Sequence, residues 1–206
     1  MSKLLMEAIG TFFLVLVIGL TVMSPGAGAM APLAIGGILM VMVYAGAHVS
    51  GAHYNPAVTL AVWLRGACKV ADVPGYVAAQ AMGASAAALV VRICKPGSAV
   101  AAMQPEVVPA LAAEMAFTFA LAYVVLHVAT SKQTAGNSYF GLAIGGTVMA
   151  GAYAVGNISG GVFNPAVAVG LTLMGLSSLG NLWLYLLANC AGGVLAALVF
   201  RLTARD

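Results

Sequence analysis

The chain has 206 residues, of which 63% are hydrophobic and only 6% are charged, and its formal net charge is +3. A water-soluble globular domain has roughly 25% charged residues, so this composition excludes a soluble protein and indicates a polytopic membrane protein. We interpret the small positive charge as a signal of membrane topology, so no nucleic-acid partner is expected.

Long apolar segments recur along the whole chain. In chain order they cover about residues 4–23, 32–49 and 74–94 in the first half, and about 109–129, 139–157 and 181–201 in the second. A helix that spans a bilayer needs roughly 20 mostly apolar residues. The sequence therefore predicts an all-α protein with six transmembrane helices, whose many small residues allow close helix packing.

The segment between the second and third predicted spans, residues 50–70, is apolar but too short to cross the membrane and return. Gly51 and Pro56 interrupt it, and Asn55 directly precedes the proline. Asn before Pro is typical of a helix start, because Asn caps the free amides and Pro fits the first turn. We predict a re-entrant half-helix from residue 56 to about residue 63.

The second half of the chain repeats the first. Residues 142–167 align on residues 33–58 with 14 identities in 26 positions, so that Asn164-Pro165-Ala166 matches Asn55-Pro56-Ala57. The repeat predicts a second half-helix from residue 165 to about residue 173.

Each half contains three predicted spans, and an odd number places the second half in the membrane upside down. The result is an inverted repeat with a pseudo-two-fold axis in the membrane plane. We expect one transmembrane domain made of two repeats, about residues 1–98 and 108–206. The two half-helices would enter from opposite faces and meet near the midplane.

The basic residues indicate the orientation of the chain. With the N-terminus inside, the predicted spans place six of the eight on the cytoplasmic side, namely Lys3, Arg65, Lys69, Lys132, Arg201 and Arg205, and two outside, Arg92 and Lys95. Because cytoplasmic loops carry an excess of Lys and Arg, we expect both termini to be cytoplasmic. The expected location is the cytoplasmic membrane of a prokaryote.

Two half-helix N-termini that point at one spot form a positive electrostatic focus. Asn55 and Asn164 would offer amide donors there, and unwound backbone on either side would offer carbonyl acceptors. A neutral solute can bind both kinds of group, whereas cations and protons meet an unfavourable potential. This pattern predicts a pore for water and small uncharged solutes in the lipid bilayer.

Glu7 and Glu114 are ionisable residues inside predicted spans, and each is followed at the same spacing by Thr-Phe, so the two segments align. Such residues often mark function, which here would be proton coupling in a secondary transporter. The alternative is that each carboxylate accepts N–H groups of one motif loop, and the occurrence of one glutamate per loop favours it. His48 and His53 flank the first loop and could form a pH gate, but we expect them mainly to support the loop.

Other chemistry has little support in the sequence. Cys68, Cys94 and Cys190 lack metal-ligand spacing, and the repeated Ser50 and Ser159 have no distinctive catalytic partner. We predict no catalytic residue, no metal and no cofactor. A non-conducting scaffold is a further alternative.

Residues 50–59, Ser-Gly-Ala-His-Tyr-Asn-Pro-Ala-Val-Thr, resemble the first signature loop of the aquaporin and glycerol-channel family, the major intrinsic proteins. The resemblance covers nearly the whole chain. It implies the hourglass fold of six helices and two re-entrant half-helices, a passive channel, and usually a homotetramer with one pore per subunit.

The chain departs from this family at one important position. An arginine usually follows the second Asn-Pro-Ala, and here that position is Val167. By spacing from the motifs, the other three positions of the family's selectivity filter fall on Ile35, Ala152 and Gly161. At these four positions, water-selective members of the family typically carry Phe, His, a small residue and Arg.

The departure predicts a wide, uncharged filter, because long and aromatic side chains are missing. The expected cargo is arsenous acid or other neutral metalloid hydroxides, glycerol, urea and ammonia, with water also passing. A water-selective aquaporin is the nearest alternative, and a proton-coupled transporter of small solutes is the second.

Overall fold

The computed structural model describes residues 1–98 and 101–204 and contains eight α-helices within them. Their bounds are α1 (Ser2–Val22), α2 (Ala31–Ser50), α3 (Pro56–Arg65), α4 (Val73–Cys94), α5 (Val107–Val125), α6 (Phe140–Ser159), α7 (Pro165–Met174) and α8 (Leu182–Thr203). All except α3 and α7 belong to segments that are long and apolar enough to cross a membrane. The prediction of six spans is confirmed.

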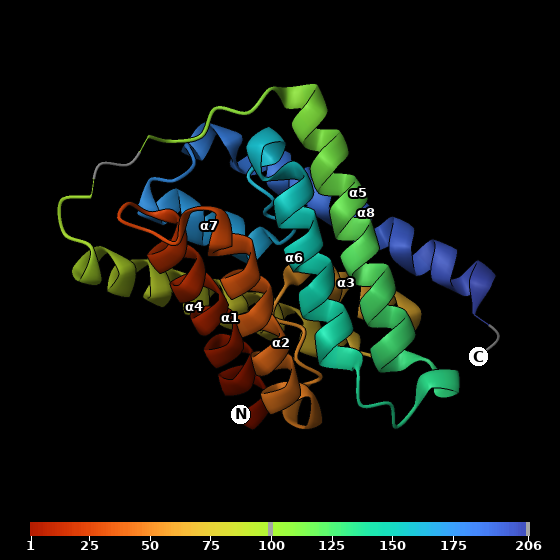
Figure 1. The fold of residues 1–206 in the computed structure, drawn as a ribbon. Helices are drawn as coiled ribbons and strands as arrows, with labels where there is room; N and C mark the ends of the chain where they lie inside the picture. The colour runs from red at the N-terminus through yellow and green to blue at the C-terminus, as the bar shows by residue number, and fades with distance from the viewer. Residues whose placement is uncertain (99–100, 205–206) are drawn as a thin grey trace.

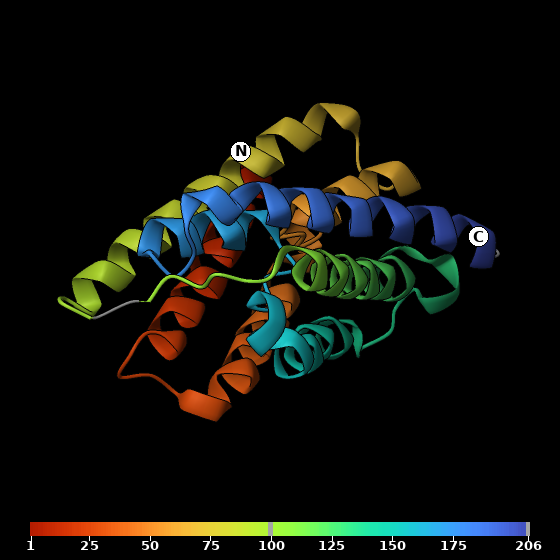
Figure 2. The same cartoon turned by 90° about the horizontal axis from the view of Figure 1, so that it is seen from above.

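The two halves of the chain interlock. In each half the first helix packs against the second and third long helices, so that α1 contacts α2 and α4, and α5 contacts α6 and α8. Each half-helix packs mainly against a long helix of the other half, α3 against α8 and α7 against α4. Figures 1 and 2 show α7 beside α4 and α3 beside α8, with α2 and α6 side by side. Neither half therefore completes its packing alone.

The half-helices α3 and α7 have ten residues each. At 1.5 Å per residue this is about 15 Å, roughly half the hydrocarbon thickness of a bilayer. Each ends at a glycine in the left-handed conformation, Gly66 at φ 89° and Gly175 at φ 80°. Glycine adopts this conformation without a side-chain clash, so the chain can turn sharply and leave the half-helix.

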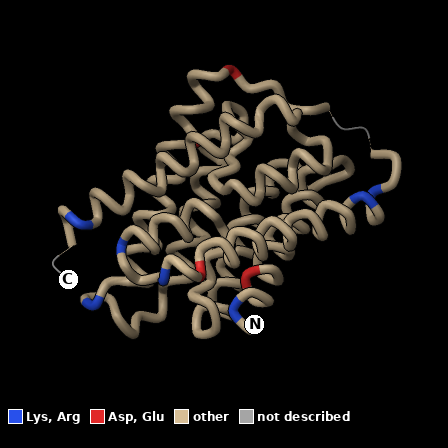
Figure 3. Tube along the Cα trace, turned by 180° about the vertical axis from the view of Figure 1, so that it is seen from behind, with Lys and Arg blue, Asp and Glu red and all other residues tan. Residues whose placement is uncertain are grey.

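Lys and Arg residues lie in two groups at opposite ends of the helices. Lys3, Arg65, Lys69, Lys132 and Arg201 lie at the end where α1 begins and α8 finishes, which we call the N-terminal face (Figure 3). Arg92 and Lys95 lie at the far end of α4, on the opposite face. Arg205, assigned above to the first group, lies outside the described residues.

Close backbone contact joins α2 to α6 at a pair of glycines. A Cβ atom on Gly36 would lie 2.6 Å from the carbonyl oxygen of Gly145, well inside van der Waals contact. Small residues at such crossings are the usual means of packing helices in membranes. Because lipid tails are as apolar as the side chains, helices associate through van der Waals contacts and not through the hydrophobic effect. This contact holds the two halves together along the cavity described below.

We therefore expect Gly36→Ala to destabilise the protein. The added methyl group meets backbone, which cannot rotate away, and overpacking of this kind costs about 1–3 kcal/mol. Thermal unfolding of the detergent-solubilised protein measures the loss. The matched control is Gly37→Ala, because a Cβ atom on this neighbouring glycine meets nothing within 4 Å. Equal melting temperatures for the two variants would contradict the role assigned to the Gly36 contact.

Candidate functional site

The two Asn-Pro-Ala motifs meet where α3 and α7 begin. The Nδ2 atom of Asn55 donates to the carbonyl oxygen of Phe163 at 2.8 Å, and Nδ2 of Asn164 donates to the carbonyl oxygen of Tyr54 at 2.9 Å. Each bond crosses from one half of the chain to the other. The pair of bonds therefore fixes the two half-helices end to end.

The same asparagines cap their own helices. Oδ1 of Asn55 accepts from the N–H groups of Ala57 and Val58 at 2.9 and 3.4 Å, and Oδ1 of Asn164 accepts from Ala166 and Val167 at the same distances. With Oδ1 held by the cap and one N–H group by the opposite loop, the second N–H of each amide remains available to a solute. Both asparagines line the cavity described below.

The partial positive charges of both helix N-termini add at this point. An α-helix carries about half an elementary charge at its N-terminus, and α3 and α7 point these ends at each other. A cation that approaches the two asparagines is repelled, whereas a neutral solute with an oxygen lone pair can accept their N–H groups. The site is therefore suited to uncharged polar cargo.

A buried carboxylate holds the loop before α3. The side chain of Glu7 is fully buried, and its Oε1 accepts from Ser50 Oγ at 2.6 Å and from the N–H of His53 at 3.0 Å. Its Oε2 accepts from the N–H of Tyr54 at 2.7 Å and from Gln80 Nε2 at 2.8 Å. Four donors thus surround one carboxylate, and the loop amides that lack helical partners are satisfied inside the membrane.

Glu114 does the same for the loop before α7. Its Oε1 accepts from Ser159 Oγ at 2.7 Å and from the N–H of Val162 at 2.9 Å. Its Oε2 accepts from the N–H of Phe163 at 2.7 Å and from Asn189 Nδ2 at 2.9 Å. Neither glutamate is among the residues that line the cavity, so both carboxylates face the loops and not a passing solute.

Besides Ser50 and Ser159, four residues of these networks were not among the predicted site residues. Gln80 and Asn189 bond the two carboxylates, and the hydroxyls of Tyr76 and Tyr185 donate to the carbonyl oxygens of Ser50 and Ser159 at 2.7 and 2.9 Å. The signal that could have found them is the repeat itself. The alignment of the two halves pairs Gln80 with Asn189 and Tyr76 with Tyr185, which places polar residues at equivalent positions inside two spans.

A narrow cavity lies between the two halves, with a free volume of about 30 Å³. An enclosed water needs about 10–15 Å³ measured in this way, so the space holds about two water molecules. Aliphatic side chains from α1, α2, α5 and α6 form most of the wall, and His53, Tyr54, Asn55 and Asn164 are the polar exceptions.

Three of the four predicted filter residues, Ile35, Gly161 and Val167, line this cavity, and Ala152 is not among the lining residues. Ala152 packs against Gly161, since a Cβ atom on Gly161 would lie 3.2 Å from the Cα atom of Ala152. We call Ile35, Ala152, Gly161 and Val167 the filter ring. It contains no charged group and no side-chain hydrogen-bond donor.

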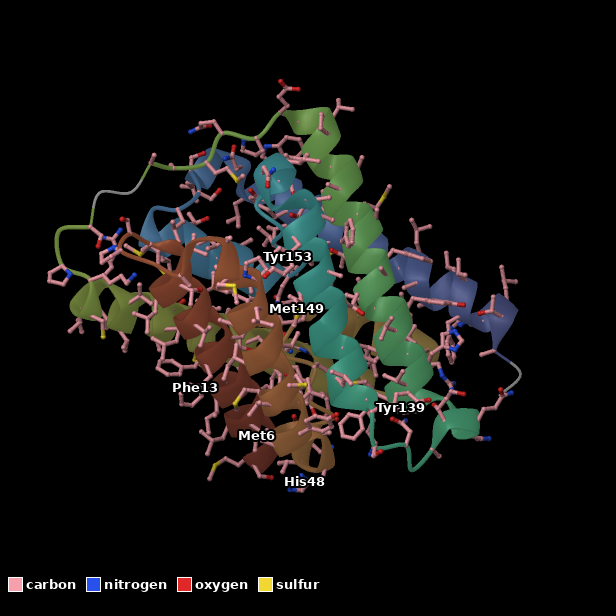
Figure 4. All side chains as sticks on the ribbon, viewed as in Figure 1. Met6, Phe13, His48, Tyr139, Met149 and Tyr153 are labelled. Atoms are coloured by element: carbon pink, nitrogen blue, oxygen red, sulfur yellow. The ribbon has the colours of Figure 1, made fainter. Side chains whose placement is uncertain are left out.

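A wider vestibule of about 530 Å³ lies at the N-terminal face, and His53 and Val125 line both this vestibule and the cavity. His53 is buried, and its Nδ1 lies 3.1 Å from Thr59 Oγ1, so this histidine is tied to α3. His48 also lines the vestibule, but its side chain is exposed at the end of α2 (Figure 4). The two histidines predicted to support the loop thus have different environments.

Comparisons with known proteins agree with this geometry. The family model described as major intrinsic protein matches residues 1–200. Aquaporin NIP1-4 of Oryza sativa subsp. japonica is 37% identical over 213 aligned residues, which cover 98% of this chain and 77% of the relative. Glycerol uptake facilitator protein-like 6 of Lactiplantibacillus plantarum is 35% identical over 211 residues, 98% of this chain and 97% of the relative.

A solved structure has the same fold. The X-ray structure of the aquaglyceroporin from Plasmodium falciparum superposes with a TM-score of 0.80 over 97% of this chain and 94% of that one, at 19% sequence identity.

The carboxylate networks generate a prediction about stability. In Glu114→Gln an NH2 group replaces one oxygen and faces donors that have no other acceptor, at a cost of about 1–3 kcal/mol for each unsatisfied group. We expect Glu114→Gln to lower the melting temperature and the permeability together. Glu7→Gln should lower both quantities in the same way. The control is Glu106→Gln, because Glu106 is exposed and caps α5 without a side-chain bond. A Glu114→Gln protein with unchanged stability but no transport would contradict the loop-support role.

Proposed function

The chain belongs to the major intrinsic protein family and is a passive membrane channel for small solutes; from this premise we propose that it conducts uncharged solutes larger than water, together with water, through a filter without arginine. The observation that carries the proposal is Val167. It follows the second Asn-Pro-Ala motif, lines the cavity and is an aliphatic residue of modest size.

The filter ring supports this cargo by its size and its chemistry. Valine in place of a long cationic side chain leaves room at the ring, and Ala152 and Gly161 occupy little of the remaining cross-section. Channel selectivity depends on pore width, on lining donors and acceptors, and on electrostatic barriers. This ring offers width and an apolar surface, while the two half-helix N-termini supply the barrier to cations.

Several neutral solutes fit such a path. We propose glycerol-like polyols, urea, ammonia and neutral metalloid hydroxides such as arsenous acid as candidate cargo. The name of the bacterial relative, a glycerol uptake facilitator-like protein, supports the polyol class. The polar contacts that these solutes need would come from the spare N–H groups of Asn55 and Asn164 and from loop carbonyls.

The assembly and orientation are proposed on related grounds. We propose a homotetramer of single-domain subunits, each made of two inverted repeats, about residues 1–98 and 108–206. The excess of Lys and Arg at the N-terminal face supports cytoplasmic termini, and the bacterial relative supports the inner membrane of a prokaryote.

The variant Val167→Arg tests the cargo. We expect its permeability to glycerol, urea and arsenous acid to fall about tenfold, equivalent to about 1.4 kcal/mol of added barrier, while water still passes. Stopped-flow light scattering on reconstituted liposomes measures each rate. Val167→Met adds length without charge and separates the two effects. Equal permeation of large solutes by the wild type and Val167→Arg would contradict the proposal, and water passage with exclusion of every solute would identify a water-selective aquaporin.

Energy coupling can be tested on the same liposomes. Because the carboxylates of Glu7 and Glu114 each accept four hydrogen bonds and lie outside the cavity wall, we expect solute flux to follow its own gradient. An imposed proton gradient, or a protonophore that collapses it, should leave the initial rate of glycerol uptake unchanged. Uptake against a glycerol gradient that is driven by protons would instead identify a secondary transporter.

A further inference from the structure

We propose that a second ring of four residues, Val43, Ala52, Val58 and Ile144, limits the size of solutes that cross this pore. We call it the counterpart ring. The inference rests on the proposed function, because it assigns the width limit of the same pathway. It moves that limit away from the filter ring and toward the N-terminal face.

The repeat generates the second ring. The alignment of the two halves pairs each member of one ring with a member of the other, namely Ile35 with Ile144, Val43 with Ala152, Ala52 with Gly161 and Val58 with Val167. Helices α2 and α6 each contribute one residue to both rings. Ile35 and Val43 are eight residues apart on α2, or about 12 Å along the helix, so the rings are separate constrictions.

The contacts of the structure place the counterpart ring on the pathway. All four of its members line the narrow cavity. Ala52 has φ 52° and its partner Gly161 has φ 62°, so the two loops adopt the same left-handed backbone. The repeat therefore extends to the local geometry of the wall, and the two rings can be compared position by position.

The counterpart ring carries more side-chain bulk than the filter ring. The isoleucine and the valine after the Asn-Pro-Ala motif occur in both rings. At the other two positions, Val43 stands where the filter ring has Ala152, and Ala52 where it has Gly161. The difference is two methyl groups at one position and one at the other. With similar backbone geometry, three extra carbon atoms narrow the counterpart ring.

Exposure of the side chains agrees with this difference. In the counterpart ring Val43 is 2% exposed, Ala52 7%, Val58 2% and Ile144 5%. In the filter ring only Val167 is comparably buried, at 3%, whereas Ile35, Ala152 and Gly161 are partly exposed. Ile35 and Gly161, which line the cavity, keep more exposed surface than their counterparts Ile144 and Ala52. The counterpart ring is thus the more tightly packed of the two.

The counterpart ring, like the filter ring, is also a place where a solute must give up hydration. Its four side chains are aliphatic, and a hydroxyl without a hydrogen-bond partner is disfavoured there. His53 lies next to Ala52 and lines the vestibule as well as the cavity, while the repeat-equivalent residue beside Gly161 is Val162. The polar residue after Ala52 thus has an apolar equivalent after Gly161, so the two rings differ in this neighbour.

Widening the counterpart ring tests the inference. Val43→Ala and Ala52→Gly give it the residues of the filter ring, and glycine relieves the left-handed backbone of Ala52. Liposome swelling with glycerol, erythritol and xylitol follows solute size. We expect each variant to raise the rates for erythritol and xylitol relative to glycerol, and the double variant to raise them about tenfold, which is about 1.4 kcal/mol of barrier.

Two further variants make the comparison sharp. Val41→Ala makes the same chemical change on α2 at an exposed position two residues away, and should leave all three rates unchanged. Ala152→Val adds the same valine to the filter ring and should change the erythritol rate less than Val43→Ala does. Water permeability and thermal unfolding are measured on each variant to show that it is folded. If Val43→Ala is unstable, Ala52→Gly still widens the counterpart ring and tests the inference alone.

The outcomes separate this inference from the proposed function. If Ala152→Val slows erythritol while Val43→Ala and Ala52→Gly change nothing, the filter ring sets the limit and the inference is overturned. If the wild type passes water but no solute, the proposed cargo is wrong. In that case, glycerol passage through the double variant would still support the inference about the counterpart ring. Continued exclusion of glycerol by the double variant would overturn that inference.

Discussion

A backbone that leaves the helical conformation inside a bilayer has no water to satisfy its N–H and C=O groups, and each unpaired group costs several kcal/mol. This chain does so twice, directly before α3 and before α7. In both places one buried glutamate accepts two loop N–H groups, a serine hydroxyl and a side-chain amide. The half-helices, and with them the pore, depend on these two carboxylates.

Once the loops are held, the rest of the site follows from their geometry. The loops present the carbonyl oxygens of Tyr54 and Phe163, which accept the amides of Asn164 and Asn55 from the other half. These bonds align two helix N-termini across the cavity, and α3 and α7 are in turn packed against α8 and α4. The positive electrostatic potential at the two asparagines is therefore a property of the fold and needs no charged side chain.

The repeat makes the two halves of the cavity wall similar, and in the function proposed here small departures from the symmetry set the selectivity. With valine at position 167, the filter ring has no charged side chain. Steric differences then carry the proposal, and the two rings differ by a few methyl groups, at Val43 against Ala152 and at Ala52 against Gly161. His53 against Val162 adds a polar difference. The two halves of the duplicated scaffold thus differ through single side chains.

The sequence by itself determined the six spans, the two half-helices and the duplication, because apolar length and the Asn-Pro signature act over neighbouring residues. It also indicated that Glu7 and Glu114 serve the loops. Only the tertiary structure showed that Gln80 and Asn189 complete those networks, that each asparagine bonds a carbonyl in the opposite half of the chain, and that the counterpart ring is buried while most of the filter ring is not. The physical reason is that hydrogen-bond partners and pore width depend on distances between segments remote in the chain, and local sequence patterns carry no information on those distances.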